Sequence, residues 1–206
     1  MDNLKPNTTK KLISRESSTH IPTKYGIFHA FAYVDKTTGS EHLALVNGEI
    51  KSDEPINVRV HSECLTGDTL GSLKCDCGQQ LDFALNYIAK NGGVVLYLHD
   101  HEGRGIGLVN KIKAYELINH GLDTVEANLK LGLPVENRNY ETGAQILVDL
   151  GVRKMNLLTN NPAKITGLSD YGLEIVKRVP IEIIPNKNNG KYLKTKRDKM
   201  GHILSN

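Results

Sequence analysis

The sequence predicts an α/β (α+β) fold: a single domain built on a mixed sheet, with antiparallel N-terminal strands and flanking helices. Between residues 25 and 61, three short apolar and β-branched runs are separated by the turn-forming segments KTTGS and KSDEP, which is typical of antiparallel strands. After them, strand-like runs alternate with helical patterns over the last two thirds of the chain. The 206 residues are enough to bury a proper core, and no internal repeat is visible.

The first half of the chain is expected to contribute an arm, the antiparallel strands and one helix. Residues 1–20 are polar and rich in Lys, Ser and Thr, which predicts a flexible N-terminal arm before a folded domain over 21–206. Strands are expected at 25–34, 42–50 and 55–61, the last leading into a loop that contains cysteines. Apolar residues at 81, 84, 85 and 88 have the spacing of an amphipathic helix, which two glycines at 92 and 93 end.

The second half is expected to alternate strands with helices. The apolar run at the start of 93–100 predicts a buried strand, which leads into the glycine-rich segment HEGRGIG. Helices are expected at 108–121, 123–131 and 142–150, followed by a strand from residue 152, a helix from 162 to about 172, an extended segment at 173–184 interrupted by a proline, and a basic helix in the tail. The cations of TKRDK, at 195–199 in this tail, can face substrate, a partner subunit or water, and solvated surface is the default expectation.

Composition and charge are those of an ordinary globular protein, with 39% hydrophobic and 24% charged residues. A net charge of +3 is weak for wrapping nucleic acid, and few aromatic residues with no Trp disfavour a base-stacking surface. We therefore expect a small anionic ligand and no nucleic-acid partner. Since the N-terminus has no apolar signal region and no stretch approaches eighteen apolar residues, we expect no membrane association and a cytoplasmic location.

The three cysteines of the chain lie close together, as Cys64, Cys75 and Cys77 in the pattern C-x10-C-x-C. Three thiolates on one loop can converge on a tetrahedral Zn²⁺. Four interpretations are open: unrelated buried thiols, a disulfide with one odd thiol, a structural site closed by His61, and an open site in which water completes the coordination. We favour the open site, because the cysteines cluster beside Gly and Asp in a polar loop and nothing marks the chain as secreted.

A second candidate site for chemistry is the segment HEGRGIG between a predicted strand and a predicted helix. Its glycines form G-x-G-x-G, which is neither the dinucleotide fingerprint nor a Walker A loop, yet its backbone and Arg104 can face phosphate. Arg59, Arg138 and Lys164 also lie in loop-like sequence. Beside a zinc centre, such cations suit a substrate that combines a hydrolysable ring or carbonyl with a polyphosphate.

Seven motifs occur in order along the chain: RVHSECLTGD, LKCDCG, EGRGIGL, KIKAYELI, DTVEAN, LTNNPAK and KMGH. Together they resemble GTP cyclohydrolase II, over a stretch from about residue 22 to 204. The resemblance implies that 21–206 is a catalytic domain in which a zinc-activated water opens the imidazole ring of GTP at C8. Formate and pyrophosphate would leave, giving 2,5-diamino-6-ribosylamino-4(3H)-pyrimidinone 5′-phosphate in the first committed step of riboflavin biosynthesis.

The resemblance also assigns roles to individual residues. Cys64, Cys75 and Cys77 match the zinc ligands, Arg138 matches an arginine that attacks the α-phosphate, and Glu136 is its expected proton acceptor. Tyr115 matches a tyrosine near the zinc-bound water, where a phenol can orient or donate a proton. Positions that hold GTP are matched by Arg59, Val60, His61, Ser62, Glu63, Gln80, Glu102, Gly103, Arg104, Thr124, Thr159 and Lys164.

Two further partners follow from the resemblance: Mg²⁺ on the triphosphate, and a second copy of the chain in a homodimer. Family members can carry a butanone-phosphate synthase in front of this domain, and fewer than 25 residues precede the matched region, so we expect that activity to be absent.

The sequence departs from the family pattern in two places. Glu136 stands where Asp is frequent, which changes the reach of the proton acceptor, and His101 stands where Gln is common. We expect His101 to lie in solvent. Two alternatives to the full reaction are a divergent relative that performs only part of it and a non-catalytic zinc-stabilised module that binds nucleotide. Such a module has no need of Arg138 with Glu136.

Overall fold

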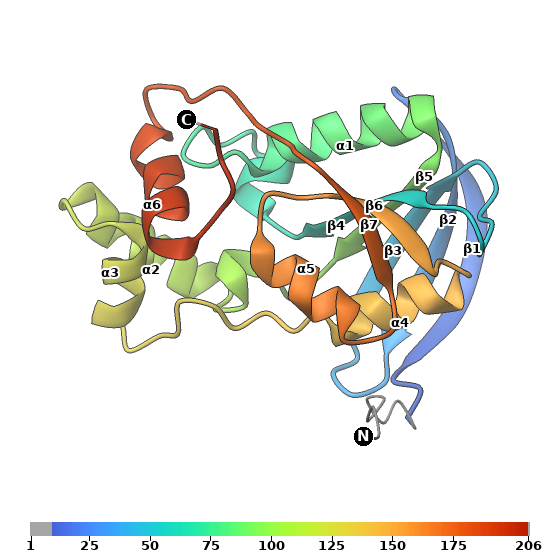
Figure 1. Ribbon diagram of the computed structural model, residues 1–206. Helices are drawn as coiled ribbons and strands as arrows, with labels where there is room; N and C mark the ends of the chain where they lie inside the picture. The colour runs from blue at the N-terminus through green and yellow to red at the C-terminus, as the bar shows by residue number, and fades with distance from the viewer. Residues whose placement is uncertain (1–9, 206) are drawn as a thin grey trace, which may run out of the picture.

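The computed structural model describes residues 10–205, and its centre is a seven-stranded sheet (Figure 1). The strand order is β1-β2-β3-β5-β4-β6-β7. The strands span Ile13–Thr23 (β1), Gly26–Asp35 (β2), Glu41–Asn47 (β3), Ile56–Ser62 (β4), Gly93–Leu98 (β5), Lys154–Leu158 (β6) and Glu174–Val179 (β7). The first three and β5 pair antiparallel, whereas β4 pairs parallel with β5 and β6, and β6 with β7. The predicted α/β fold with a mixed sheet and a single domain is therefore confirmed.

One strand predicted to be antiparallel is parallel. The chain leaves β4, forms the cysteine loop and helix α1 (Cys77–Asn91), and returns as β5 in the same direction beside β4. This is a βαβ crossover, which requires parallel strands and a covering helix. The continuous apolar run of β5 fits this arrangement, because parallel strands are covered on both faces, whereas β4 alternates apolar and polar residues and so has the sequence pattern of an antiparallel strand.

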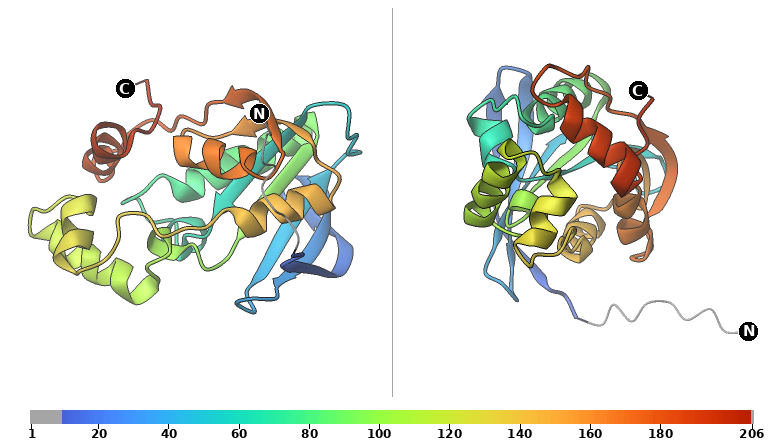
Figure 2. Two further views of the ribbon diagram at one scale, coloured as in Figure 1. Left: turned by 60° about the horizontal axis from the view of Figure 1, so that its bottom comes forward. Right: turned by 90° about the vertical axis from the view of Figure 1, so that its left-hand side faces the viewer.

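Helices cover both faces of the sheet (Figure 2). Helix α1 packs on one face through Ala84 and Ile88, which join Phe28 and Val95 in a small core. Helices α4 (Glu141–Asp149) and α5 (Pro162–Ser169) cover the other face over the main core, where Leu147 and Leu168 meet the parallel strands. Each helix thus buries one apolar stripe against the sheet, as the sequence spacing predicts.

The predicted flexible arm is wrong for residues 13–20, which belong to β1. This edge strand pairs with β2 along its length, yet most of its side chains are exposed, so its sequence lacks the apolar alternation of a strand. Near its start, Arg15 hydrogen-bonds to Asp149 of α4, and so does Tyr33, which lies opposite Arg15 on β2, so that the edge of the sheet is tied to the helical layer. The rest of the predicted arm, up to residue 9, lies outside the described residues.

The helix predictions agree with the structure in type and approximate position. Helix α1 begins earlier than its apolar stripe, so that Cys77 is its first residue. Helix α3 (Thr124–Lys130) has a capping box made by Asp123 and Glu126. Pro162 is the first residue of α5, after the N-cap Asn161.

Helices α2 (Leu108–Asn119), α3 and α6 (Gly190–Met200) gather to one side of the sheet, beyond the carboxyl ends of β4 and β5 (Figures 1 and 2). The space between this group and the strand ends is where ligands bind in open α/β sheets. Among the helices within residues 10–205, none combines the length and apolarity that crossing a lipid bilayer demands.

Candidate active site

A cleft opens at the carboxyl ends of β4 and β5. All the predicted site residues except Val60 and Glu136 line this cleft. The side chain of Val60 is fully buried in the main core, so it cannot touch a ligand; only its carbonyl faces the site, where it accepts a hydrogen bond of 2.7 Å from Lys164 Nζ.

The three cysteine sulfurs converge in the cleft, all within 4.8 Å of one another. Cys64 follows β4 and precedes the short π-helix η1 (Leu65–Thr69), whereas Cys75 and Cys77 lie at the start of α1. The thiols are free, with 3.8 Å between the sulfurs of Cys64 and Cys75. The structure thus contradicts both unrelated thiols and a disulfide with one odd thiol.

Two glycines permit this convergence. A Cβ on Gly67 would lie 2.9 Å from Cys75 Sγ and 3.1 Å from Cys64 Sγ, in the space between the sulfurs. A Cβ on Gly78 would lie 2.3 Å from the carbonyl oxygen of Gly67. The backbone of η1 can therefore approach the start of α1 closely only because neither position carries a side chain.

The electrostatics of the cluster fit a divalent cation. The neighbouring thiols of Cys75 and Cys77, and the ammonium of Lys111, lower the pKa of the Cys64 thiol. The pKa of Cys75 is raised to about 11, in the first place by its contact with Cys64. Three adjacent thiols resist ionising together unless a cation offsets their charge, and thiolates at this spacing are ligands that Zn²⁺ accepts.

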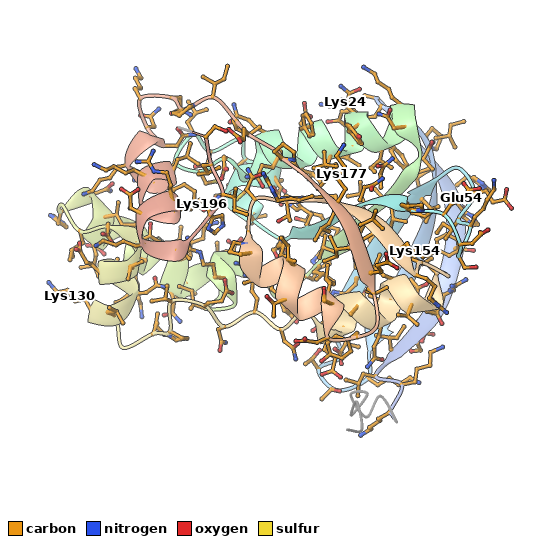
Figure 3. The ribbon with its side chains drawn as sticks, viewed as in Figure 1. Lys24, Glu54, Lys130, Lys154, Lys177 and Lys196 are labelled. Atoms are coloured by element: carbon orange, nitrogen blue, oxygen red, sulfur yellow. The ribbon has the colours of Figure 1, made fainter. Side chains whose placement is uncertain are left out.

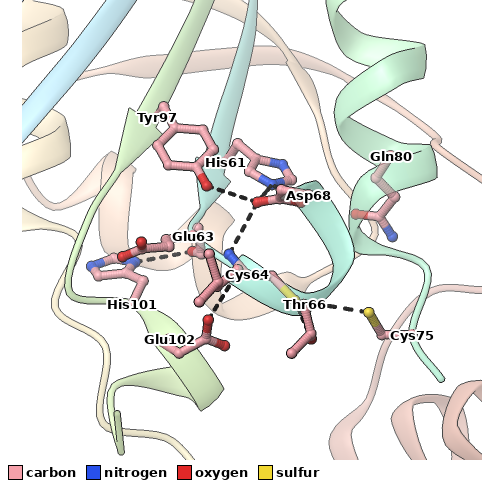
Figure 4. Close-up of polar contacts among 12 residues, drawn as sticks. His61, Glu63, Cys64, Thr66, Asp68, Cys75, Gln80, Tyr97, His101 and Glu102 are labelled. Carbon is pink, nitrogen blue, oxygen red and sulfur yellow. Dashed lines mark hydrogen bonds and ion pairs between the residues drawn. The ribbon is translucent and has the colours of Figure 1, made fainter. Parts of the chain in front are cut away.

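His61 does not close the cysteine cluster. Its Nε2 faces the carboxylate of Asp68, at 3.0 and 3.1 Å from the two oxygens, and its Nδ1 lies 3.4 Å from Arg59 Nη2 (Figure 4). These partners assign the proton to Nε2 and leave Nδ1 to accept from Arg59. Burial lowers the pKa of His61 to about 4, so the ring is neutral at neutral pH. The structure therefore contradicts the alternative of a structural site with His61 as fourth ligand.

Asp68 joins the cysteine loop to the sheet. Besides His61, its carboxylate accepts hydrogen bonds from the hydroxyl of Tyr97 on β5, at 2.9 Å, and from the backbone N–H of Cys64, at 3.0 Å (Figure 4). Its side chain is 4% exposed, so these bonds are made away from water and hold the geometry firmly. Sequence reasoning missed Asp68, because its partners lie seven and twenty-nine residues away.

Cations line the same cleft as the cysteines. Arg59 and Lys164 are both buried, and burial together with the charges of Arg59 and Arg138 keeps the pKa of Lys164 well below its ordinary value. Arg59 Nε and both terminal nitrogens of Arg104 are shielded from solvent without a hydrogen-bond partner within the described residues. Buried donors without partners are costly, and an anionic ligand in the cleft would supply the acceptors.

Arg138 and Glu136 form a close ion pair beside these cations. Arg138 Nε donates to Glu136 Oε1 at 2.7 Å, the second guanidinium nitrogen contacts Oε2, and the backbone N–H of Arg138 donates to Oε1 at 3.1 Å. The longer side chain of Glu136, compared with Asp, therefore reaches the guanidinium fully. Burial alone would lower the pKa of Arg138, but the Glu136 carboxylate raises it above its ordinary value.

The glycine-rich segment forms a loop with an unusual backbone. Asp100 and Arg104 have φ values of 61° and 67°, a left-handed conformation that is rare for residues with a side chain. Inside it, both carboxylate oxygens of Glu102 are used within the protein: Oε2 accepts from the N–H of Leu65 at 2.6 Å, and Oε1 contacts Lys111 Nζ at 2.5 Å. Glu102 thus ties the glycine loop to the cysteine loop.

His101 does not lie in solvent, contrary to our expectation. It is 9% exposed, and its Nδ1 lies 3.0 Å from Ser62 Oγ. Burial, with the nearby charges of Lys164 and Arg138, lowers the pKa of His101 to about 3. His101 is therefore uncharged at neutral pH and forms part of the wall of the cleft.

The C-terminal helix contributes residues that the sequence did not reveal. Tyr192 and Lys196 of α6, and His202 after it, line the cleft. Lys196 Nζ bonds to Asp76 Oδ1 at 2.7 Å, and Lys196 is 8% exposed, whereas the labelled Lys130 lies at the periphery (Figure 3). Lys196 is thus an exception to the expectation that the cations of the tail are solvated, because its partner lies 120 residues away between two cysteines.

Comparisons with known proteins agree with these features. The profile of the GTP cyclohydrolase II family matches residues 14–180. The riboflavin biosynthesis protein RibBA of Aquifex aeolicus (strain VF5) is 59% identical over 194 residues, which are 94% of this chain and 48% of that protein. The monofunctional riboflavin biosynthesis protein RIBA 3, chloroplastic, of Arabidopsis thaliana is 56% identical over 194 residues, 94% of this chain and 38% of that protein. The chain spans about half of the length of such relatives, or less.

A solved structure shares the fold. RibBX, described as a two domain 3,4-dihydroxy-2-butanone 4-phosphate synthase from A. baumannii, superposes with a TM-score of 0.52 and 27% sequence identity. The match covers 85% of this chain and 42% of that one. Since that protein is described by a different reaction, the fold by itself does not decide the chemistry.

The glycine between the sulfurs gives a first prediction. Gly67→Ala would place a methyl group against Cys64 and Cys75, and the sulfurs would have to separate. We expect the purified variant to retain less than about a tenth of the wild-type metal content, measured by mass spectrometry, since misplaced ligands lose affinity. Gly190→Ala is the matched control, because nothing lies within 4 Å of its Cβ position. Equal metal content in the two variants would contradict the role of Gly67.

The buried histidines give a second prediction. Burial holds the pKa of His61 and His202 at about 4 and that of His101 at about 3, below the ordinary value of 6.5. Each therefore takes up a proton on unfolding at acid pH, so its contribution to stability is complete above about pH 6.5 and is lost as the pH falls. We expect the free energy of unfolding, from urea titrations, to decrease between about pH 6.5 and 5.

The same titrations on His101→Gln isolate one of these groups. The variant is expected to take up about one proton fewer on unfolding in this range, because glutamine does not titrate. An unchanged slope of the free energy of unfolding against pH would show that His101 is not held neutral by burial.

Proposed function

Because the chain belongs to the GTP cyclohydrolase II family, we propose that it hydrolyses GTP with release of formate and pyrophosphate. The product is 2,5-diamino-6-ribosylamino-4(3H)-pyrimidinone 5′-phosphate, and the reaction is the first committed step of riboflavin biosynthesis. The observation that carries the proposal is the pairing of two opposite chemistries in one cleft. Three convergent thiols line the same cleft as buried cationic donors that have no hydrogen-bond partner within residues 10–205.

The cysteine cluster is assigned to a zinc ion. Cys64, Cys75 and Cys77 would hold it, and a zinc bound by three protein ligands supplies a Lewis acid that brings the pKa of a water near neutrality. The cleft residue Tyr115 keeps its proton at neutral pH, because burial raises its pKa to about 12. Its phenol can donate a proton or a hydrogen bond at the guanine ring.

The cations of the cleft are assigned to the triphosphate. Arg59, Arg104 and Lys164 would bind its oxygens, and Mg²⁺ bound to the same oxygens would offset the remaining charge. Binding of an anion would also raise the depressed pKa of Lys164. Lys164 would then be protonated in the complex, and its charge would strengthen binding of the anion. Val60 and Glu102 would not bind the triphosphate directly, because their polar groups already form hydrogen bonds within the protein. They would instead hold neighbouring residues in position.

Arg138 is assigned the attack on the α-phosphorus, which forms a guanylyl link to the arginine and releases pyrophosphate. A protonated guanidinium is a poor nucleophile, and its proton must leave during the attack. Glu136 Oε1 already accepts from Arg138 Nε at 2.7 Å, so the proton moves along an existing hydrogen bond to the carboxylate. Water then cleaves the link and restores both side chains.

Two alternatives make different predictions for the same incubation. A relative that performs only part of the reaction would release formate without pyrophosphate, or the reverse. A module that only binds nucleotide would release neither. Retention of the Arg138–Glu136 pair favours the full reaction, because a binding module has no use for a paired arginine whose nitrogen faces the cleft.

Product analysis tests the proposal. Incubation of the purified, zinc-loaded protein with GTP and Mg²⁺ is expected to release formate and pyrophosphate in equal amounts, measured by coupled enzyme assays. Arg138→Ala is expected to slow pyrophosphate release by about 100-fold or more, since it removes a group that acts at the reacting phosphorus. Arg197→Ala, on the exposed side of α6, is the control and should leave both rates unchanged. Release of neither product by the wild type would overturn the proposal.

The proposal includes a homodimer in the cytoplasm. A reducing compartment keeps three clustered thiols available for metal. For the dimer, the support is a set of exposed apolar side chains near the cysteine loop, where η1 and α2 are neighbours (Figure 2). Leu70 and Val109 are each 70% exposed, and Leu73 and Ile112 are 54% and 50% exposed, so η1, the residues after it and α2 offer apolar surface that a second copy of the chain would cover.

Sedimentation tests the dimer. The wild-type chain is expected to sediment at twice its mass of 22.8 kDa, and Val109→Glu combined with Leu70→Glu to sediment as a monomer, because two buried charges would face the partner. Exposed Ile184→Glu, which lies far from this patch in sequence, is the control. A monomeric wild type at micromolar concentration would refute this part of the proposal.

A further inference from the structure

Lys111 is a buried charged residue for which no role has been assigned so far. It lies in the first turn of α2, is 6% exposed and lines the cleft next to the cysteine cluster. Its Nζ contacts three acceptors: Cys64 Sγ at 3.1 Å, Thr66 Oγ1 at 2.8 Å and Glu102 Oε1 at 2.5 Å. A lysine ammonium has three N–H donors, so all of them are used within the protein. Lys111 is therefore not available to bind a phosphate.

The geometry points to a function for Lys111 toward the metal: it is a positioning residue that fixes the Cys64 thiolate and offsets its charge, and so keeps the metal in the site. This inference rests on the proposed zinc centre. Three thiolates and one divalent cation carry a net charge of −1, which is costly in a site with little solvent. The ammonium lies within hydrogen-bond distance of the Cys64 sulfur and shares its positive charge between that sulfur and the carboxylate of Glu102.

The surroundings of Lys111 support a fixed position rather than a flexible one. Glu102, which could compete for the ammonium, is itself held by the backbone N–H groups of Leu65 and Gly103. Leu65 follows Cys64 directly. Glu102 therefore holds the cysteine loop through the backbone N–H of Leu65, and Lys111 holds it through the sulfur of Cys64. Groups around ligands that orient them in this way commonly matter about 10–100-fold for metal affinity.

A lysine that served only as the counter-ion of Glu102 would leave the sulfur unaffected. An N–H···S hydrogen bond, by contrast, withdraws electron density from the thiolate and lowers the energy of its lone pairs. This difference can be measured without any activity assay, in the charge-transfer band between thiolate and Co²⁺ when cobalt replaces zinc.

The experiment compares the wild type with Lys111→Met, Lys111→Arg and Lys113→Met. Lys113 lies on the same helix and is exposed, so its substitution is the matched control. Zinc-loaded proteins are challenged with increasing concentrations of a chelator, and the metal retained is measured by mass spectrometry. The charge-transfer band is recorded on the cobalt forms.

We expect Lys111→Met to release zinc at about 10–100-fold lower chelator concentration than the wild type. Its charge-transfer band should move to longer wavelength. Lys111→Arg, which keeps the charge, should restore part of both properties, and Lys113→Met should match the wild type. Should Lys111→Met fail to fold by circular dichroism, Lys111→Gln takes its place with the same expected outcome.

The two proposals can fail separately. A wild-type protein that binds no metal would refute the proposed zinc centre and the function that depends on it. A wild type that binds zinc, with Lys111→Met equal to it in chelator resistance and in the cobalt band, would overturn only the role of Lys111.

Discussion

The structure depends on bringing three cysteine sulfurs to one point in a nearly dry site. Thiolates repel one another, and the loop that carries them must bend sharply, so neither the charge nor the backbone favours the arrangement by itself. The fold supplies what the loop lacks. Gly67 and Gly78 allow the backbones to approach, Asp68 anchors the N–H of Cys64, and Lys111 places a positive charge beside its sulfur.

These supports come from separate elements, and this links the cysteine cluster to the whole domain. Asp68 holds the cysteine loop to β5 through Tyr97 and, through His61, reaches Arg59 on β4. Arg59 in turn bonds to Gln80, which bonds to Asp76, and Asp76 bonds to Lys196 of the C-terminal helix. A single buried network therefore joins the cysteine loop, Arg59 and α6. Such a network is stabilising only when all of its members are satisfied.

The cations of the cleft show the opposite behaviour. Within the described residues, Arg59, Arg104 and Lys164 have no carboxylate partner that offsets their charge. Burial and the charges of Arg59 and Arg138 depress the pKa of Lys164, and donors of Arg59 and Arg104 have no partner within residues 10–205. This arrangement lowers the stability of the free protein. An anionic substrate would offset the repulsion among these cations. The free energy recovered in this way would contribute to substrate binding. Sites that break the rules of folding in this way are commonly functional sites.

The sequence by itself determined the class of fold, most helices and strands, the cluster of three cysteines and the cations of the cleft, because these depend on local periodicity and on residue types that carry chemistry. It did not determine β1, whose exposed polar side chains have no pattern, nor the parallel direction of β4, which the return of the chain through α1 imposes. Only the tertiary structure showed that His101 and Lys196 are buried, and that Asp68 and Lys111 support the cysteine loop. These residues act through partners distant in the chain, and sequence spacing contains no record of which distant groups the fold will bring within hydrogen-bond distance.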